Sequence, residues 1–478
     1  MSASTGAGRA TGWLGATAAF AIIGCTWALA TARYGGPDEP AHVTRAAAAA
    51  HGDLVGRPVE GFAPGYRQVT VPAALSTGDP ACYRHDEKIT ADCSVAGSPS
   101  GDIAVATSAG AAPPWFYVVV GGIARVFSSG DGVMAYRMAS VVLCAIILGF
   151  ALTRSRRAAW LFAALTPSAW FLLGVVGTSA IEIALVAVAT VEAVARFDTE
   201  RAEASLAWVS VPLAVCLVLR PAAFIDIAIV ALLVIPTLPR PFGMRRMATL
   251  VGPVVLAGVA SLAWSRWTGL VVSDKRTADS DSFASALSRS IRGIPTTVNQ
   301  AIGALGWNEF FAPVIAQFVW VAVLIAAVSW TIRQGSGPRW HVAWLAAALV
   351  LPTLAEVAVH TRIGEIWQGR YSISFAMGGV LYAARNELPR RVVMIGIVAA
   401  AAGAEVLTLW QTLRRYMVGL DGSLTLRSPS WSPPLNPWLL IAMNAVAVAW
   451  LAAQTLPQPS GVFQAHLGAS SHSTGFRR

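Results

Sequence analysis

The sequence predicts an all-α polytopic membrane protein with about twelve transmembrane helices. Of its 478 residues, 55% are hydrophobic and only 13% are charged, about half the charge of an ordinary globular domain. The charges lie in short clusters between apolar runs of roughly 17 to 25 residues, the length that crosses a bilayer as a helix. Because hydrocarbon offers the backbone no hydrogen bonds, such runs are expected to be helices and not strands.

The net charge of +10 does not indicate a nucleic-acid partner. Nearly all of the positive charge is arginine, since Lys88 and Lys275 are the only lysines. The arginines lie at the ends of apolar runs and form no single basic stripe, which is typical of a protein anchored at membrane interfaces. The chain also has no glycine-rich phosphate loop, so a cytoplasmic nucleotide-sugar substrate is not expected.

The twelve expected spans begin with residues 13–32. This run is long for the apolar part of a signal peptide and precedes no small-residue cleavage site, so we interpret it as a retained helix. The number of spans stays open near 115–128 and 205–237. The remaining spans are expected at 133–152, 158–176, 180–196, 205–219, 221–237, 246–265, 312–332, 340–359, 370–384, 391–410 and 437–454.

Arginines recur in alternate short loops, and they predict the orientation. The positive-inside rule places both termini in the cytoplasm and three polar segments outside, at about 33–132, 266–311 and 411–436. These outer segments are expected to carry short helices. Residues 1–455 would form one transmembrane domain, and residues 456–478, rich in Ser, Gly and His, a disordered cytoplasmic tail.

Two cysteines, Cys82 and Cys93, lie in the first outer segment, which faces an oxidising compartment in this topology. A disulfide between them is the simplest interpretation. A zinc site that includes His85 is the alternative, although no fourth ligand is evident.

The first outer segment begins with a cluster of polar side chains next to the end of a span. Asp38, Glu39, His42 and Arg45 lie within eight residues, and the surrounding glycines and prolines predict a tight turn that leads into a short helix. A carboxylate held at the membrane surface can accept a proton from a hydroxyl nucleophile. Asp38 could instead simply cap the helix, since Asp is a preferred N-cap residue.

Several segments resemble a bacterial family of membrane proteins known as domain of unknown function 2142, which is similar to the GT-C superfamily of lipid-dependent glycosyltransferases. Residues 36–46, with the sequence Gly-Pro-Asp-Glu-Pro-Ala-His-Val-Thr-Arg-Ala, resemble the signature motif of this family. The resemblance extends over about residues 30–420, with further matching segments at 112–117, 165–168, 177–182, 306–307 and 368–371. One departure stands out, because relatives usually carry Asn-Pro-Asp where this chain has Gly177-Thr178-Ser179. If that Asp has a function in relatives, the function is lost in this chain or is carried out by Glu182.

The resemblance implies a GT-C-like fold in the bacterial plasma membrane with its active face outside. It further implies an inverting transfer of sugar from a polyprenyl-phosphate donor to a cell-envelope glycan or lipid acceptor. Asp38 and Glu39 would be catalytic, or would bind a divalent cation, Mg or Mn. Arg370 is suited to bind the donor phosphate, because one guanidinium can donate hydrogen bonds to two phosphate oxygens at once. Interfacial anchoring is the alternative for Arg370 and for Tyr371 beside it.

Other polar residues are candidates for contacts with substrate or lipid head groups, each with a structural alternative. A carboxylate inside a span, such as Glu182, needs a polar cavity or a partner. Glu356 and His360 are one helical turn apart and could form a polar wall or a structural pair. The substrate-binding candidates are His42, Arg45, Glu182, Trp307, Glu356, His360, Arg414 and Arg415.

Two other classes of function stay open at this stage. A transporter or lipid flippase would need charged or broken-helix sites near the bilayer midplane, and only Glu182 and Asp226 come near that depth. A non-catalytic partner in envelope assembly would use the Asp38-Glu39 pair only to cap a helix.

Overall fold

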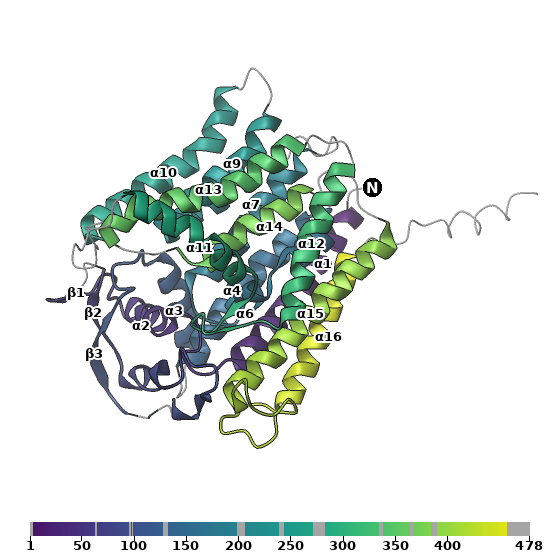
Figure 1. Ribbon diagram of the computed structural model, residues 1–478. Helices are drawn as coiled ribbons and strands as arrows, with labels where there is room; N and C mark the ends of the chain where they lie inside the picture. The colour runs from purple at the N-terminus through teal and green to yellow at the C-terminus, as the bar shows by residue number, and fades with distance from the viewer. Residues whose placement is uncertain are drawn as a thin grey trace, which may run out of the picture.

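The computed structural model describes residues 3–62, 65–94, 97, 99–127, 132–197, 206–238, 243–270, 283–333, 338–363, 367–383 and 390–456. The tail predicted at 456–478 lies outside these residues except for Leu456. Helices dominate the described chain (Figure 1). Seven of the described helices are long and apolar enough to cross a membrane. They are α1 (Ala3–Ala30), α4 (Val133–Arg154), α7 (Thr178–Ala195), α10 (Met244–Thr268), α12 (Val314–Arg333), α15 (Arg391–Val418) and α16 (Pro437–Thr455).

Shorter helices fill the space between the long ones, which agrees with a helical membrane protein. The predicted span 158–176 is divided into two seven-residue helices, each too short to cross hydrocarbon by itself. Thr166 accepts from the amide of Ala169 and Pro167 starts the second helix, so the chain breaks there. The shorter helices are α3 (Trp115–Phe127), α5 (Ala158–Ala164), α6 (Pro167–Leu173), α8 (Leu206–Leu219), α9 (Phe224–Val234) and α14 (Ile373–Ala383). The helix α13 (Pro338–Ile363) has 26 residues, but its apolar stretch is limited to Ala346–Ala358.

The helix α15 is longer than its predicted span 391–410. Its 28 residues extend about 42 Å at the rise of an α-helix, more than the thickness of the hydrocarbon. The last outer loop therefore starts near residue 419 and not at 411. Arg414 and Arg415, predicted in a loop, lie on the final turns of this helix.

The first outer segment contains a small antiparallel sheet that was not expected from the sequence. Its order is β1 (Arg57–Pro58), β2 (Arg67–Pro72), β3 (Asp102–Thr107). Alternate residues of β2 are buried, with Val69 and Val71 turned inward toward the helix α2 (Glu39–Ala50). Short 3₁₀ turns connect these elements at η1 (Ala73–Ser76), η2 (Pro80–Cys82) and η3 (Ala91–Cys93). The first outer segment is thus folded, with strands that pack on α2 in addition to the short helices that were expected.

The second outer segment consists of the helix α11 (Phe283–Gly303) and a tight hairpin of β4 (Ala304–Leu305) and β5 (Phe310–Phe311). The hairpin turn has positive φ at Gly306 and Asn308, residue types that adopt this conformation readily.

The three outer segments contact one another. The indole of Trp307 in the second segment donates to the carbonyl oxygen of Tyr34 in the first, at 2.9 Å. The amide of Leu420, in the loop between α15 and α16, donates to the carbonyl oxygen of Glu87, also at 2.9 Å. Figure 1 shows the sheet and the α15–α16 connection at the end of the helices opposite to the N-terminus. The polar segments therefore form one layer.

The helix α7 lies at the centre of the bundle, with nearly every residue buried. A polar cluster joins α1, α15 and α16 within the apolar core. Glu405 accepts from the indole of Trp27 and from the amide of Asn444, both at 2.7 Å, and Thr26 donates to Asn444 at 2.8 Å. Such paired polar groups fix how helices pack in an apolar environment.

Candidate functional site

Asp38 is held at the start of α2 by an unusual backbone conformation. Its φ is 59° and its ψ is 9°, in the left-handed region that Asp tolerates better than most residues. The side chain makes no capping hydrogen bond to the helix. It faces Arg370 instead, with 2.5 Å between Oδ2 and Nη2. The side chain of Asp38 is 46% exposed and that of Arg370 only 10%, so an accessible carboxylate lies on a largely buried guanidinium.

Arg370 is positioned by the short turn η7 (Gly369–Ser372) at the start of α14. The amide of Gly369 donates to the side chain of Gln300 in α11 at 3.0 Å, and α11 approaches so closely that a side chain at Gly369 would collide with Gln300 and Ala301. Arg370 also donates to the hydroxyl of Tyr371 at 3.1 Å. The turn is thereby fixed against α11, and it presents the guanidinium to Asp38.

A second arginine, Arg220, lies behind Tyr371. Its guanidinium is 3.7 Å from the centre of the Tyr371 ring, and it pairs with Glu182 of α7 at 2.6 Å. Nearby, Asp226 of α9 accepts from the hydroxyl of Ser374 at 2.6 Å. Arg220 is not among the site residues predicted from the sequence. Its signal was a charge at a Pro-broken point between two short apolar helices.

His42 lies one helical turn beyond Asp38. Its Nδ1 is 2.8 Å from the hydroxyl of Tyr117 in α3, and the two rings stack. Gly177 lies against the other side of the imidazole, where an added Cβ would be 3.6 Å from Cδ2. The turn that departs from the family pattern, Gly177-Thr178-Ser179, therefore borders the site.

The pKa values of Asp38 and His42 are both lowered, but by different causes. Burial acts to raise the pKa of Asp38, but the guanidinium of Arg370 outweighs it and holds that pKa below its usual value. Burial lowers the pKa of His42 to about 4, with Arg370 and Arg220 acting in the same direction against Asp38. At neutral pH the site therefore contains an ionised carboxylate and an uncharged imidazole.

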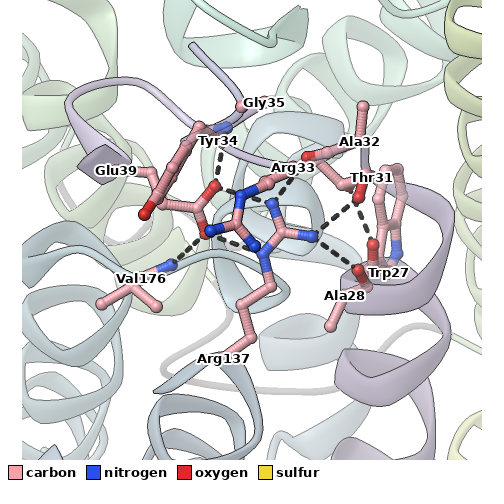
Figure 2. A network of polar contacts seen from close by, with 12 residues as sticks. Trp27, Ala28, Thr31, Ala32, Arg33, Tyr34, Gly35, Glu39, Arg137 and Val176 are labelled. Atoms are coloured by element: carbon pink, nitrogen blue, oxygen red, sulfur yellow. Dashed lines mark hydrogen bonds and ion pairs between the residues drawn. The ribbon is translucent and has the colours of Figure 1, made fainter. Parts of the chain in front are cut away.

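Glu39 is a structural residue, contrary to the expected catalytic or metal-binding role. It is fully buried, and Arg137 of α4 binds both of its carboxylate oxygens, at 2.8 and 2.7 Å (Figure 2). The amides of Gly36 and Val176 donate to the same two oxygens. Arg137 also donates to three carbonyl oxygens at the end of α1, those of Ala28, Thr31 and Ala32.

These contacts do not fit a metal site at Asp38 and Glu39. Each carboxylate is paired with its own arginine, Arg370 for Asp38 and Arg137 for Glu39. Within the described ranges, no group of three or more His, Cys, Asp and Glu side chains is arranged to hold an ion.

Several other candidates make structural contacts away from Asp38. Arg45 is fully buried, lies over the ring of Tyr117 and donates to the carbonyl oxygens of Asp53, Leu54 and Ala112. Arg415 is also fully buried and donates to the carbonyl oxygens of Tyr83, Asp86 and Ile89. The physical reason is the same for both. A guanidinium with five donors stabilises irregular loops, whose carbonyl groups have no helix or sheet partners.

Trp307, Arg414 and Glu356 also have partners outside the Asp38 cluster. The ring of Trp307 lies under the guanidinium of Arg84, with 5.1 Å to the ring centre, and Arg414 donates to the carbonyl oxygen of Gly422 at 2.8 Å. Glu356 is buried and accepts from the amide of Trp367 at 2.8 Å. His360 lies on the same helix, and its side chain is outside the described part of the structure.

An apolar cavity of about 680 Å³ lies next to the turn that carries Arg370. Trp367 and Ser372, on either side of that turn, form part of its wall, together with Gln300. Trp320 and Trp344 line its interior, and Arg289 and Arg292 of α11 line another part. The cavity thus lies among α11, α12, α13 and α14, and its size and lining are typical of a small-molecule or lipid site.

The first outer segment is closed covalently. Cys82 and Cys93 form a disulfide, with 2.14 Å between the sulfur atoms. Cys144 in α4 and Cys216 in α8 are buried free thiols, and Cys25 in α1 is half-buried.

The pH dependence of stability should reveal two buried groups of the outer layer. Folded His42 stays neutral down to about pH 4 whereas an unfolded His titrates near 6.5, so stability should fall as pH drops between these values. Burial raises the pKa of Glu309 to about 7, far above the roughly 4.3 of an unfolded Glu. Its contribution should therefore fall as pH rises from about 4.3 to about 7.

Melting temperatures measured in detergent between pH 4.5 and 7.5 would check this. His42→Gln should remove the acid-side loss, and Glu309→Gln should remove the opposite slope. A His42→Gln variant with the wild-type pH profile would contradict the assignment of the acid-side slope to His42.

The chain matches the model of one protein family over residues 20–378, three quarters of its length. That family is described as predicted membrane protein, DUF2142, and the chain belongs to it. The resemblance to this family, stated from the sequence motifs, is thereby confirmed. No curated protein matches the chain, and no solved structure does.

Proposed function

We propose that this member of the DUF2142 family transfers a sugar from a polyprenyl-phosphate donor to a cell-envelope glycan or lipid, at the outer face of the bacterial plasma membrane. In this proposal it is a GT-C-like protein of about twelve spans with cytoplasmic termini. One observation carries the proposal. An accessible carboxylate, Asp38, and a buried guanidinium, Arg370, meet from positions 332 residues apart, beside a large apolar cavity.

The pair suits a single displacement at the anomeric carbon. Asp38 accepts the proton of the acceptor hydroxyl while the hydroxyl oxygen forms a bond to the anomeric carbon. The bond between the anomeric carbon and the phosphate oxygen breaks, and its electrons leave with the lipid phosphate. Arg370 stabilises the charge that develops on that phosphate, because guanidinium donates to two oxygens at once. The configuration at the anomeric carbon is inverted.

The contact between Asp38 and Arg370 also suggests how the base is activated. Arg370 keeps the pKa of Asp38 low, so the carboxylate is a weak base while the two side chains are paired. A donor phosphate competes for the same guanidinium. Once the phosphate binds Arg370, Asp38 loses that partner and its basicity rises beside the substrate.

The apolar cavity provides a place for the hydrocarbon chain of the donor. Its wall includes Trp367 and Ser372, which flank Arg370 in the sequence. A phosphate bound by Arg370 would therefore have its lipid chain directed into the space lined by Trp320 and Trp344. Burial of such a chain contributes about 0.8 kcal/mol per CH₂ group.

Donor binding can be tested by filling the cavity. The full-length protein in lipid nanodiscs is incubated with polyprenyl phosphate, and binding is followed by native mass spectrometry. Ala348→Trp, in the cavity wall, should weaken binding about tenfold or more, since the ring occupies the space of several CH₂ groups.

The matched control is Ala445→Trp, which fills a separate apolar groove of about 570 Å³ on α15 and α16. It should leave binding unchanged. Equal binding by wild type and Ala348→Trp, or equal losses in the two variants, would refute the proposed donor site. Release of polyprenyl phosphate from a radiolabelled polyprenyl-phosphate sugar by the wild-type protein tests the transfer itself.

A transporter is the second candidate, favoured by the charges inside the bundle. Glu182, Arg220 and Asp226 lie on or between apolar helices, where charges often mark a transport path. Glu182→Gln would then abolish substrate movement in proteoliposomes, and no sugar transfer would be detected with the wild-type protein.

A further inference from the structure

We propose that the outer layer contains a second ligand site, a pocket for a neutral saccharide between the disulfide-closed segment and the loop before α16. The pocket has a volume of about 380 Å³, within the range of small-molecule sites. Neither Asp38 nor Arg370 lines it. The pocket does not depend on the proposed transfer, because a protein that only binds or moves glycans could use it as well.

Four parts of the chain build the pocket. The end of α1 contributes Leu29, Thr31 and Arg33, and the start of α4 contributes Val133, Met134 and Arg137. The segment next to the disulfide contributes Asp92 and Ser94. The loop before α16 contributes Ser430, Trp431, Ser432 and Pro434. Leucine, valine and methionine form an apolar surface, and the polar groups come mainly from the outer segments.

These walls are fixed before any ligand binds. Asp92 directly precedes Cys93 of the disulfide, and the hydroxyl of Ser94 donates to the carbonyl oxygen of Gly78 at 2.8 Å. The ring of Trp431 lies edge-on to Tyr416 of α15, with 6.0 Å between the ring centres. A pocket whose walls are already ordered loses less entropy on binding.

The charges of the pocket favour a neutral ligand over an anion. Arg137 is neutralised by its two bonds to Glu39. Arg33 donates to the carbonyl oxygens of Thr77 and Ala74, at 3.0 and 2.7 Å. Asp92 is the one carboxylate among the lining residues, and it would repel a phosphate. The two arginines therefore shape the pocket and do not make it an anion site.

The remaining groups match the two kinds of surface on a sugar ring. The C–H face of a pyranose is apolar and packs on an aromatic ring, here that of Trp431. Its hydroxyl groups donate to a carboxylate such as Asp92, and they exchange hydrogen bonds with serine hydroxyls such as those of Ser430 and Ser432. The apolar lining residues Leu29, Val133 and Met134 provide further surface for the C–H groups of the ring. A saccharide unit of an envelope glycan has this combination of properties.

Saturation-transfer NMR on the full-length protein in nanodiscs tests the site. The probes are the methyl glycosides of glucose, galactose, mannose and N-acetylglucosamine. We expect at least one to bind, and Trp431→Leu and Asp92→Asn each to weaken it about tenfold or more. Trp431→Phe should keep most of the affinity, which separates a lost stacking surface from a misfolded loop.

Two control variants complete the design. Trp438→Leu removes a Trp that is 52% exposed at the start of α16 and outside this pocket, and it should bind like wild type. Asp38→Asn should also bind like wild type, even if it abolishes transfer, so a failed transferase leaves this site testable. The proposal is overturned if no glycoside binds, if Trp431→Leu binds like wild type, or if the signal follows the nanodisc head group and not the sugar.

Discussion

Replacing Arg137 with methionine is expected to destabilise the protein by about 3 to 5 kcal/mol, because it leaves the Glu39 carboxylate buried without a counter-charge. Both side chains are at most 1% exposed, and Arg137 also holds three carbonyl oxygens at the end of α1. The measurement is thermal or denaturant unfolding of the purified protein in detergent.

Two comparisons separate this pair from ordinary ion pairs. Lys88→Ala breaks the contact between Lys88 and Asp421, whose side chains are 64% and 68% exposed, and should not change stability measurably. The double variant Arg137→Met with Glu39→Gln removes the unpaired charge and should be more stable than Arg137→Met alone. Equal stability of Arg137→Met and Lys88→Ala would show that the buried pair does not hold the first outer segment.

Asp38→Asn is expected to lower the rate of sugar transfer by a factor of about 10² to 10⁴, the usual contribution of a general base. Asn has nearly the same shape, and it tolerates the left-handed backbone that Asp38 adopts, so the fold should persist. Turnover is measured as release of polyprenyl phosphate in nanodiscs, with melting temperature as the check on folding.

Asp102→Asn is the matched control, because Asp102 is an exposed Asp at the start of β3 in the same outer segment. It should transfer at the wild-type rate. If Asp38→Asn also transfers at the wild-type rate, the base has been assigned to the wrong residue.

The long apolar helices were predictable from the sequence, and the interrupted ones were not. Uninterrupted runs such as 133–152 and 437–454 correspond closely to α4 and α16. The run 158–176 is also predominantly apolar, yet it is broken at Thr166-Pro167. Hydropathy averages over a window, whereas a break depends on one residue that lacks an amide hydrogen. The sheet was missed for a similar reason, because strands of six residues give a weak signal inside a polar segment.

The candidate site shows the same division between local and long-range information. Asp38 and Arg370 were both proposed from their local motifs, but nothing in either motif predicts that they touch. Asp38 and Glu39 looked equivalent in the sequence, and opposite surroundings separate them in the structure. Arg137, which pairs with Glu39, lies outside the motifs, and so does Arg220, which pairs with Glu182 beside Tyr371. Their only sequence signal was a charge near an apolar run, and this signal does not identify a partner.

The pair of Glu39 and Arg137 also sets an order of events during synthesis. Glu39 leaves the ribosome 98 residues before Arg137, which corresponds to about 5 to 20 s of translation. During that interval the carboxylate that will later be buried beside α1 has no counter-charge. The first outer segment must therefore wait in a hydrated state until α4 arrives. Its final docking is coupled to insertion of the second long helix and cannot be completed by the segment alone.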